Sequence, residues 1–261
     1  MQLEHIIRTP VGTSKSTPIL MLHGAWHGAW CYDHWLDDFA AHGYEAHAIS
    51  LPGHGKSESD RPVNAYRIRD YVAALRETIA AMTPAPIVIA HSMGGYVLQS
   101  YLRDHTLPGA VLLASLPVRG ALPYYLRLML HDPLLFFWMN LTMNSWIAIN
   151  TPERFAYHFL TPQTAELAKQ YVPFIGKEST VGAIELMLPL RHAERVKTPI
   201  LCVAAEQDAI FTVHEEQATA KAYHADWRLI KGQGHDLMLD SDWLETAATI
   251  REWLERSQPS A

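Results

Sequence analysis

The sequence predicts an α/β fold, in which a mostly parallel central sheet carries helices on both faces. Two observations predict it. Short apolar runs, typical of strands buried on both faces, alternate along the chain with longer segments of helical spacing. This alternation stops after residue 115 and resumes at residue 190. We therefore expect a core of residues 1–115 and 190–261, with a helical insertion of residues 116–189.

Six short runs have the length and the flanking turns of strands, and they lie at residues 18–23, 44–50, 86–90, 110–114, 199–204 and 226–230. The segments between them are predicted to be helices by their spacing or by a closing glycine, at residues 36–42, 66–82, 94–103, 213–223 and 243–254. Because helices separate consecutive strands, we expect crossover connections and parallel pairing.

The composition excludes several classes of protein. Of the 261 residues, 49% are hydrophobic and 18% are charged, which is typical of a core-rich globular protein and not of a disordered one. The net charge is −6 and no basic block occurs, so we expect no nucleic-acid partner. No stretch reaches the roughly 18 apolar residues of a membrane helix, so we expect no stable membrane span.

The location is predicted from two weak signals. Residues 1–10 lack the apolar run of a signal peptide. The two cysteines, Cys31 and Cys202, are far apart and do not have metal-site spacing, so we expect two free, buried thiols. Together these features favour a cytoplasmic protein, and no pattern indicates its oligomeric state.

The most informative segment is residues 86–95, where Ser92 follows an apolar strand and precedes a helix. A serine on such a turn is held in strained backbone geometry above the edge of the sheet. Small neighbours are required because other backbone passes nearby, and Ala90 and Gly94 meet that requirement. Ala90 replaces the Gly of the formal Gly-x-Ser-x-Gly pattern. Taken alone, Ser92 could equally be an ordinary helix N-cap.

A serine nucleophile needs a base, and the base needs an orienting acid. Asp208 follows the strand at 199–204 and His235 follows the strand at 226–230, so both should lie at the same sheet edge as Ser92. The chain order of these three residues matches that of nucleophile-elbow hydrolases. Glu206 is the alternative acid, whereas Asp236 is adjacent to His235 and poorly placed to hold its ring.

The segment 23–30, His-Gly-Ala-Trp-His-Gly-Ala-Trp, follows the first strong strand. Its position allows the Ala25 amide to act with the Met93 amide as an oxyanion hole. A metal site at His23 and His27 is the alternative, but a Gly-rich loop does not hold that spacing and no third ligand is near, so we predict no metal. Residues 53–57 superficially resemble a phosphate-binding loop and are better explained as a turn.

The insertion is apolar, with sixteen apolar or aromatic residues among the 25 of segment 122–146. Cap helices that pack on one another and on the core are the simpler interpretation. A second hypothesis is an adaptable apolar pocket for the substrate. Its predicted lining is Trp26, Tyr124, Tyr125, Leu128, Phe137, Trp138 and Met143. An exposed apolar surface could instead contact lipid or a partner chain.

Five motifs in order resemble the α/β-hydrolase superfamily, in its serine-nucleophile esterase- and lipase-like branch. They are segments 23–30, 51–57 and 90–95, the segment around Asp208, and residues 234–238. The first is similar to that of plant methylesterases and hydroxynitrile lyases, and the third to that of bacterial lipases and monoacylglycerol lipases. The resemblance covers nearly all of the chain outside the insertion.

The resemblance implies an α/β-hydrolase fold with the insertion as a cap over the site. It implies Ser92 as nucleophile, His235 as base, Asp208 as acid, and the Ala25 and Met93 amides as the oxyanion hole. We therefore expect a cofactor-free hydrolase of small to medium apolar carboxylic esters that forms an acyl-enzyme. The alternatives are a thioesterase, a C–C hydrolase or another acyl-transfer enzyme on the same residues, and a ligand-binding relative with negligible turnover.

Overall fold

The predicted fold is confirmed by the computed structural model, which describes residues 1–257. Seven strands form one sheet in the order β1-β3-β2-β4-β5-β6-β7. Their bounds are β1 His5–Arg8, β2 Ile19–Leu22, β3 Ala46–Ile49, β4 Ile87–His91, β5 Ala110–Leu113, β6 Ile200–Ala205 and β7 Asp226–Ile230. Strands β2 to β7 pair in parallel, as the helical crossovers require.

The strand β1 was not among those expected from the sequence. It pairs with β3 in the antiparallel direction at one edge of the sheet, with His5 opposite Ile49. Its four residues alternate between exposed and half-buried, whereas every residue of β2 is buried. A four-residue alternation is too short to predict a strand, so this edge strand is defined by its pairing rather than by its sequence.

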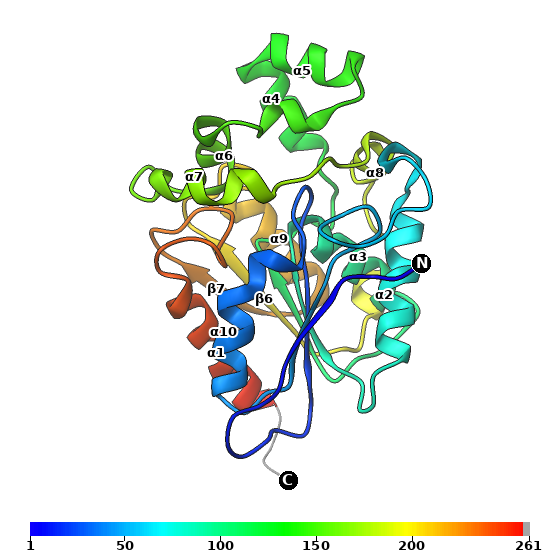
Figure 1. Cartoon of the computed structure of the whole chain (residues 1–261), viewed down its shortest axis with the longest axis vertical. Helices are drawn as coiled ribbons and strands as arrows, with labels where there is room; N and C mark the ends of the chain where they lie inside the picture. The colour runs from blue at the N-terminus through cyan, green and yellow to red at the C-terminus, as the bar shows by residue number, and fades with distance from the viewer. Residues whose placement is uncertain (258–261) are drawn as a thin grey trace.

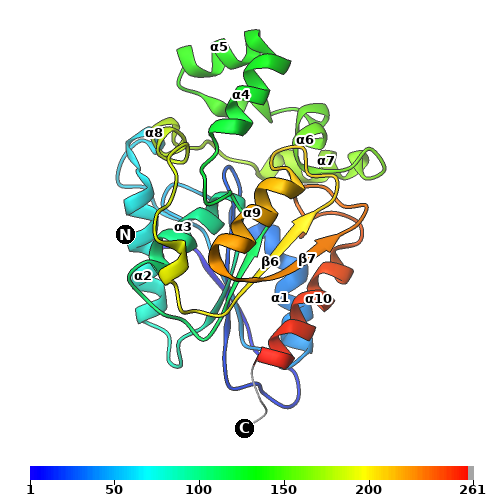
Figure 2. The same cartoon turned by 180° about the vertical axis from the view of Figure 1, so that it is seen from behind.

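Helices cover both faces of the sheet (Figures 1 and 2). On one face lie α1 (Asp33–Ala41) and α10 (Trp243–Ser257), which contact each other. The other face carries α2 (Ile68–Ala80), α3 (Ser92–Leu102) and α9 (Val213–Tyr223). The strands β2 to β6 between these two layers are buried throughout, so the core of the molecule is the sheet and the inner faces of these five helices.

The chain between β5 and β6 carries a run of helices, and we call residues 114–199 the β5–β6 segment. Its helices are α4 (Leu122–His131), α5 (Pro133–Leu141), α6 (Pro152–Phe159), α7 (Ala168–Tyr171) and α8 (Thr180–Glu185). They lie beyond the carboxyl ends of the parallel strands, with α4 and α5 farthest from the sheet (Figure 1). This segment therefore covers the edge of the sheet at which the candidate site residues lie.

Local sequence signals set where several helices begin. The Thr212 hydroxyl accepts a hydrogen bond from the Glu215 N–H, and the Glu215 carboxylate accepts one from the Thr212 N–H, which is a capping box at the start of α9. The Asp132 carboxylate caps α5 by accepting from the Leu135 N–H at 2.9 Å, and Pro133 occupies the first turn.

Two further observations concern the environment of the chain. Among residues 1–257, no helix combines the length and the apolar character needed to cross a membrane. Cys31 and Cys202 are both buried and free, which agrees with the sequence-based expectation.

Candidate active site

Ser92 is the first residue of α3 and directly follows the last residue of β4. Its φ angle is +50°, in the left-handed region that non-glycine residues rarely adopt. This conformation directs the chain from strand to helix within one residue. The Ser92 side chain is half-buried and lines a cavity at this edge of the sheet.

Close backbone contacts explain the small residues around Ser92. A Cβ atom at Gly94 would lie 2.8 Å from the Leu22 carbonyl oxygen, and one at Gly24 would lie 2.9 Å from the Ser92 Cβ. Both distances are shorter than contacts between real Cβ atoms and other heavy atoms. The loop after β2 and the turn at Ser92 therefore pack closely against each other. Ala90, which replaces the usual glycine, is fully buried within β4.

His235 and Asp208 lie on loops that follow β7 and β6, and their side chains meet. The His235 Nδ1–H donates to Asp208 Oδ2 at 2.7 Å, and both side chains are inaccessible to solvent. Asp208 Oδ1 accepts from the backbone N–H groups of Ile210 and Phe211 at 2.7 and 2.9 Å. These bonds hold Asp208 in one orientation and leave the other imidazole nitrogen of His235, Nε2, without a hydrogen-bond partner among residues 1–257.

The structure brings Asp208, rather than the alternatives Glu206 and Asp236, to the His235 ring. Glu206 instead accepts from the Gly232 N–H at 3.0 Å on the exposed surface. Asp236 Oδ2 accepts from His27 Nε2 at 3.0 Å.

His91 connects the turn at Ser92 to the loop of His235. The His91 Nε2–H donates to the His235 carbonyl oxygen at 3.1 Å, and the two imidazole rings are 4.7 Å apart. Burial, followed by the charge of neighbouring histidines, holds the pKa of His91 well below its ordinary value, so this ring is neutral. His235 is thus held beside the residue that precedes Ser92.

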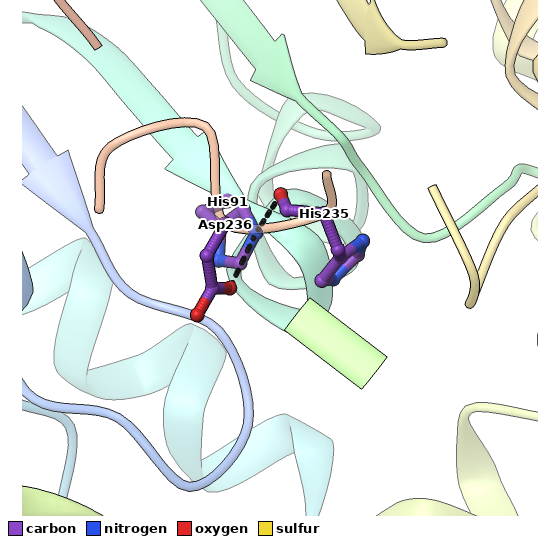
Figure 3. A group of neighbouring side chains, drawn as sticks. All are labelled: His91, His235 and Asp236. Carbon is purple, nitrogen blue, oxygen red and sulfur yellow. Dashed lines mark hydrogen bonds and ion pairs between the residues drawn. The ribbon is translucent and has the colours of Figure 1, made fainter. Parts of the chain in front are cut away.

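His91, His235 and Asp236 bring ligand-type atoms within 4.8 Å of one another (Figure 3). The His235 side chain points to the side opposite Asp236, while its carbonyl oxygen faces His91. His91 Nε2 is occupied by that carbonyl and lies 3.6 Å from Asp236 Oδ1, and His235 Nδ1 is occupied by Asp208. Each of these residues therefore uses one atom to hold the loops together, while His91 Nδ1, His235 Nε2 and Asp236 Oδ1 have no hydrogen-bond partner among residues 1–257.

A cavity of about 40 Å³ lies next to Ser92. Both expected oxyanion residues, Ala25 and Met93, lie in its wall. Met93 is the second residue of α3, where backbone N–H groups have no acceptor within the helix. The complete lining is Ala25, Trp26, Ser92, Met93, Leu116, Ala121, Tyr124, Tyr125, Glu178, Ala183, Leu186, Ile210 and Phe211.

The expected pocket residues divide into two groups. Trp26, Tyr124 and Tyr125 line this cavity, as expected from the sequence. The other four do not line it: Leu128, Phe137, Trp138 and Met143.

Each of those four residues has a different position from the one expected. Leu128 is buried beside a second hollow that Tyr157 and His158 also line. Phe137 and Trp138 lie on α5 and are more than half exposed. Met143 follows α5 and is 44% exposed. The physical reason is that α5 lies far from the sheet, and only its Met139 side chain is buried.

Two buried histidines hold the loop that follows β2, which we call the oxyanion loop (residues 23–28). The His23 Nδ1–H donates to the Gly24 carbonyl at 2.7 Å, and its Nε2 accepts from the Leu51 N–H at 2.9 Å. The Gly24 carbonyl belongs to the same peptide plane as the Ala25 N–H, so His23 fixes the orientation of that N–H. Burial lowers the pKa of His23 well below its ordinary value, which keeps this ring neutral.

His27 is the second of these histidines, and its environment raises the pKa of the ring instead of lowering it. Burial alone lowers the pKa of His27, but the charge of Asp236 and hydrogen bonds to Asp236 and Ala25 outweigh it and raise the pKa. The ring then donates from Nδ1 to the Ala25 carbonyl at 2.7 Å and from Nε2 to Asp236 at 3.0 Å. His23 and His27 are therefore committed to separate partners, and they do not form the alternative metal site.

The pair of His54 and Glu178 was not expected from the sequence. The His54 Nε2–H donates to Glu178 Oε2 at 2.8 Å, and both side chains are buried. Ser57 on the same turn donates its hydroxyl to the Ser50 carbonyl at 2.6 Å, which agrees with a structural turn. The two residues are 124 positions apart, so no local pattern in the sequence indicates this pair.

The sequence of this chain is similar to the sequences of known proteins. A model of the alpha/beta hydrolase family matches residues 19–249. Norfluorocurarine synthase 1 of Strychnos nux-vomica is 33% identical over 88 residues, which cover 33% of this chain and 33% of that protein. Pyrethroid hydrolase of Sphingobium wenxiniae is 29% identical over 89 residues, which cover 34% of this chain and 31% of that protein. The match thus spans about a third of the length of each curated relative.

Among solved structures, the monoacylglycerol lipase of Paleococcus ferrophilus has a TM-score of 0.73 at 18% sequence identity. The superposition covers 99% of this chain and 100% of that chain. The two chains therefore share their overall fold.

Proposed function

Because the chain belongs to the alpha/beta hydrolase family, we propose that it is a serine hydrolase that cleaves carboxylic esters of small to medium apolar substrates. The observation that carries this proposal is the buried hydrogen bond between His235 and Asp208, on a loop that His91 ties to the turn at Ser92. One curated relative is named a hydrolase, which agrees with hydrolytic chemistry.

In the proposed mechanism, Ser92 Oγ attacks the ester carbonyl and its proton passes to His235 Nε2. Asp208 holds the ring with its proton on Nδ1, which leaves Nε2 as the proton acceptor, and stabilises the imidazolium that forms. The Ala25 and Met93 N–H groups bind the oxyanion of the tetrahedral intermediate. His235 then gives the proton to the departing alkoxide, so an alcohol leaves and an acyl-Ser92 ester remains.

The second half of the cycle uses the same groups. His235 takes a proton from a water molecule, the resulting hydroxide attacks the acyl-Ser92 carbonyl, and the carboxylic acid leaves as Ser92 regains its proton. One ester and one water thus give one alcohol and one acid, and the proposed cycle uses only side chains and amides of this chain. Ser92 and His235 do not form a hydrogen bond among residues 1–257, as is common before a substrate binds.

The cavity supports the proposed class of substrate. Apart from Ser92, the two tyrosines and Glu178, its wall is apolar, which suits an apolar acyl or alkoxy group. The helices of residues 116–189 are proposed to form a cap, because Ala121, Tyr124, Tyr125 and Leu186 supply part of this wall.

Free buried thiols at Cys31 and Cys202 suit a reducing compartment, and the proposed location is the cytoplasm.

Replacement of Ser92 by Ala tests the proposed reaction. We expect the hydrolysis of p-nitrophenyl butyrate by S92A to fall by about 10⁶-fold, to the level of the buffer blank, because the nucleophile is lost. Undiminished turnover would contradict the proposal. A matched panel of esters and thioesters then identifies the bond that is cleaved. Stoichiometric fluorophosphonate labelling of Ser92 without multiple turnover on that panel would indicate a ligand-binding relative instead.

A further inference from the structure

Among residues 1–257, the β5–β6 segment forms hydrogen bonds with the oxyanion loop at one residue, Trp26, which follows the Ala25 amide. Phe155 and Phe159 also pack against His27 of this loop. The Gly176 N–H donates to the Trp26 carbonyl at 2.7 Å, and the Trp26 N–H donates to Glu178 Oε2 at 3.4 Å. The Trp26 indole N–H donates to the Ser145 hydroxyl at 3.0 Å. Each polar group of Trp26 is thus satisfied by a residue of the β5–β6 segment, more than a hundred positions away.

Trp26 needs such partners because its backbone is strained. Its φ angle is +63°, in the left-handed region that bulky residues rarely adopt and that costs of the order of 1 kcal/mol or more. Such a conformation persists only where the surroundings impose it. The Ala25 N–H lies in the neighbouring Gly24–Ala25 peptide, whose carbonyl accepts from His23, and the Ala25 carbonyl of the Ala25–Trp26 peptide accepts from His27. Trp26 is therefore the point at which the orientation of this N–H depends on the β5–β6 segment.

Glu178 is itself held on all sides. Its Oε2 accepts from His54 and from Trp26, and its Oε1 accepts from the Tyr71 hydroxyl at 3.1 Å and the Ser179 N–H at 2.7 Å. Burial raises the pKa of Glu178, but His54 and these donors outweigh burial and lower it, so the carboxylate is charged. Two donors on each oxygen leave no obvious site for a substrate donor, although Glu178 lies in the cavity wall.

We propose that Glu178, supported by His54 and acting together with Gly176, is a positioning residue that fixes the Trp26 backbone and thereby the oxyanion-binding N–H of Ala25. The placement of the β5–β6 segment over the site and the formation of a competent oxyanion hole then depend on the same contacts. This inference rests on the proposed function, since it concerns the oxyanion hole of that reaction.

The consequence for rate follows from geometry. An oxyanion donor that is lost altogether costs about 10²–10³-fold in kcat, and a displacement of about 1 Å costs up to about 10²-fold. Loosening Trp26 displaces the Ala25 N–H without removing it. Because the donor acts on the oxyanion rather than on the bound ester, the loss falls on kcat and leaves KM nearly unchanged.

The substitution Glu178→Gln tests this role, with Glu185→Gln as its matched control. Like Glu178, Glu185 belongs to the β5–β6 segment and joins this segment to the core. Its carboxylate accepts from Arg67 Nε at 2.7 Å and from the Ile68 N–H at 2.9 Å. Within residues 1–257, Glu185 forms no hydrogen bond with Trp26, and its side chain does not line the cavity. E185Q thus makes the same change of charge at a contact between the β5–β6 segment and the core, and this contact does not involve the oxyanion loop.

For E178Q we expect a fall in kcat of about 10–100-fold, a KM within about threefold of wild type, and an equal loss of affinity for a trifluoromethyl ketone that forms a tetrahedral adduct. For E185Q we expect all three quantities within about twofold of wild type. Equal kinetics of the two variants would overturn the proposal. A rise in KM of E178Q at unchanged kcat would also overturn it, because Glu178 would then contact substrate.

A second pair of variants tests the other half of the contact if E178Q does not fold. Gly176→Pro removes the N–H that donates to the Trp26 carbonyl. Ile175 already has the extended backbone (φ −69°, ψ 138°) that is preferred before proline, so the substitution fits the chain there. Gly176→Ala keeps this N–H, and its Cβ would lie 3.8 Å from the Trp26 oxygen, an ordinary contact. We expect a fall in kcat of about tenfold for G176P and none for G176A, and equal kcat values would overturn the proposal.

The wild-type reaction separates this inference from the proposed function. Absence of Ser92-dependent ester turnover in the wild-type protein would contradict the proposed function and the positioning role together. Ser92-dependent turnover in the wild type with unchanged kinetics in E178Q would contradict the positioning role alone. Circular dichroism and the thermal midpoint of each variant show whether its fold is retained.

Discussion

The carboxyl edge of the sheet and the β5–β6 segment are built on different principles. At the edge, hydrogen bonds between buried polar groups hold the loops: Asp208 holds His235, His23 holds the Gly24 carbonyl, and His91 holds the loop of His235. In the β5–β6 segment, large apolar side chains such as Leu130 and Leu134 are more than 70% exposed. The edge is thus held by directional hydrogen bonds, whereas the segment supplies apolar side chains to the space above it.

This difference predicts that substitutions at the edge change the rate and that substitutions in the segment change substrate preference or stability. The contacts between the two regions are the exception, since there the segment reaches the edge itself. They include the bonds to Trp26 and the bond from the Asp236 N–H to the Phe159 carbonyl at 2.9 Å. The following predictions test whether the two regions are as distinct as the structure suggests.

The largest effect is expected at the edge, from loss of the base or of its orienting acid. We expect His235→Gln to lower kcat/KM for p-nitrophenyl butyrate by about 10⁴–10⁶-fold, and Asp208→Asn by about 10⁴-fold, because the ring loses its proton-accepting role or its tautomer. Glu206→Gln, the corresponding change in the alternative acid, should have no comparable effect. Full activity in D208N would contradict the assignment of the acid.

A smaller effect is expected within the segment from His158, which lies on α6 with its Nδ1 buried and unpartnered among residues 1–257. Burial, with a contribution from His235, lowers the pKa of His158 to about 4. The unfolded chain, with an ordinary pKa near 6.5, binds the proton more readily than the folded chain. The free energy of unfolding therefore decreases as the pH falls from about 6.5 to 4. The titration of His158 accounts for about 3 kcal/mol of this decrease.

Urea denaturation at pH 7 and pH 4 measures this contribution. We expect His158→Gln to be less stable than wild type at pH 7 and to lose about 3 kcal/mol less between the two pH values. Equal losses in wild type and H158Q would show that His158 is not held neutral by the packing of α6.

The smallest effect is expected from the cavity wall, and it separates the inner and outer faces of the segment. Tyr125 lines the cavity and Trp138 is 54% exposed on α5. We expect Tyr125→Ala to raise KM for p-nitrophenyl hexanoate by about tenfold, since it loses apolar contact worth about 1–2 kcal/mol. Trp138→Ala should stay within about twofold of wild type. A larger effect in W138A would place the outer face of α5 in contact with substrate.

The sheet was predictable because each of its buried strands has a local signature. The runs at 18–23, 86–90 and 199–204 match β2, β4 and β6 to within one residue at each end. Asp208 and His235 could be placed at the edge occupied by Ser92 because parallel strands bring their carboxyl ends together. The antiparallel strand β1 was missed because four alternating residues carry too little pattern.

The lining of the cavity was only partly predictable, for two physical reasons. Helix α5 is apolar on every side and carries no charge, so its sequence gives no sign of which face is inward, and Phe137 and Trp138 proved to face outward. Glu178 and His54 lie on separate loops, and their pairing depends on the tertiary fold alone. Ile210 and Phe211 could have been anticipated, because they follow Asp208 on the same loop.

The acyl-enzyme is the most direct test of the central claim that Ser92 is the nucleophile at this edge. Brief reaction with p-nitrophenyl butyrate, an acid quench and peptide mass spectrometry should show one butyryl group on the peptide that contains Ser92. The acyl-enzyme should form more slowly in D208N, because the same base also drives acylation. A butyryl group on another residue, or S92A that turns over and acylates like wild type, would contradict the account.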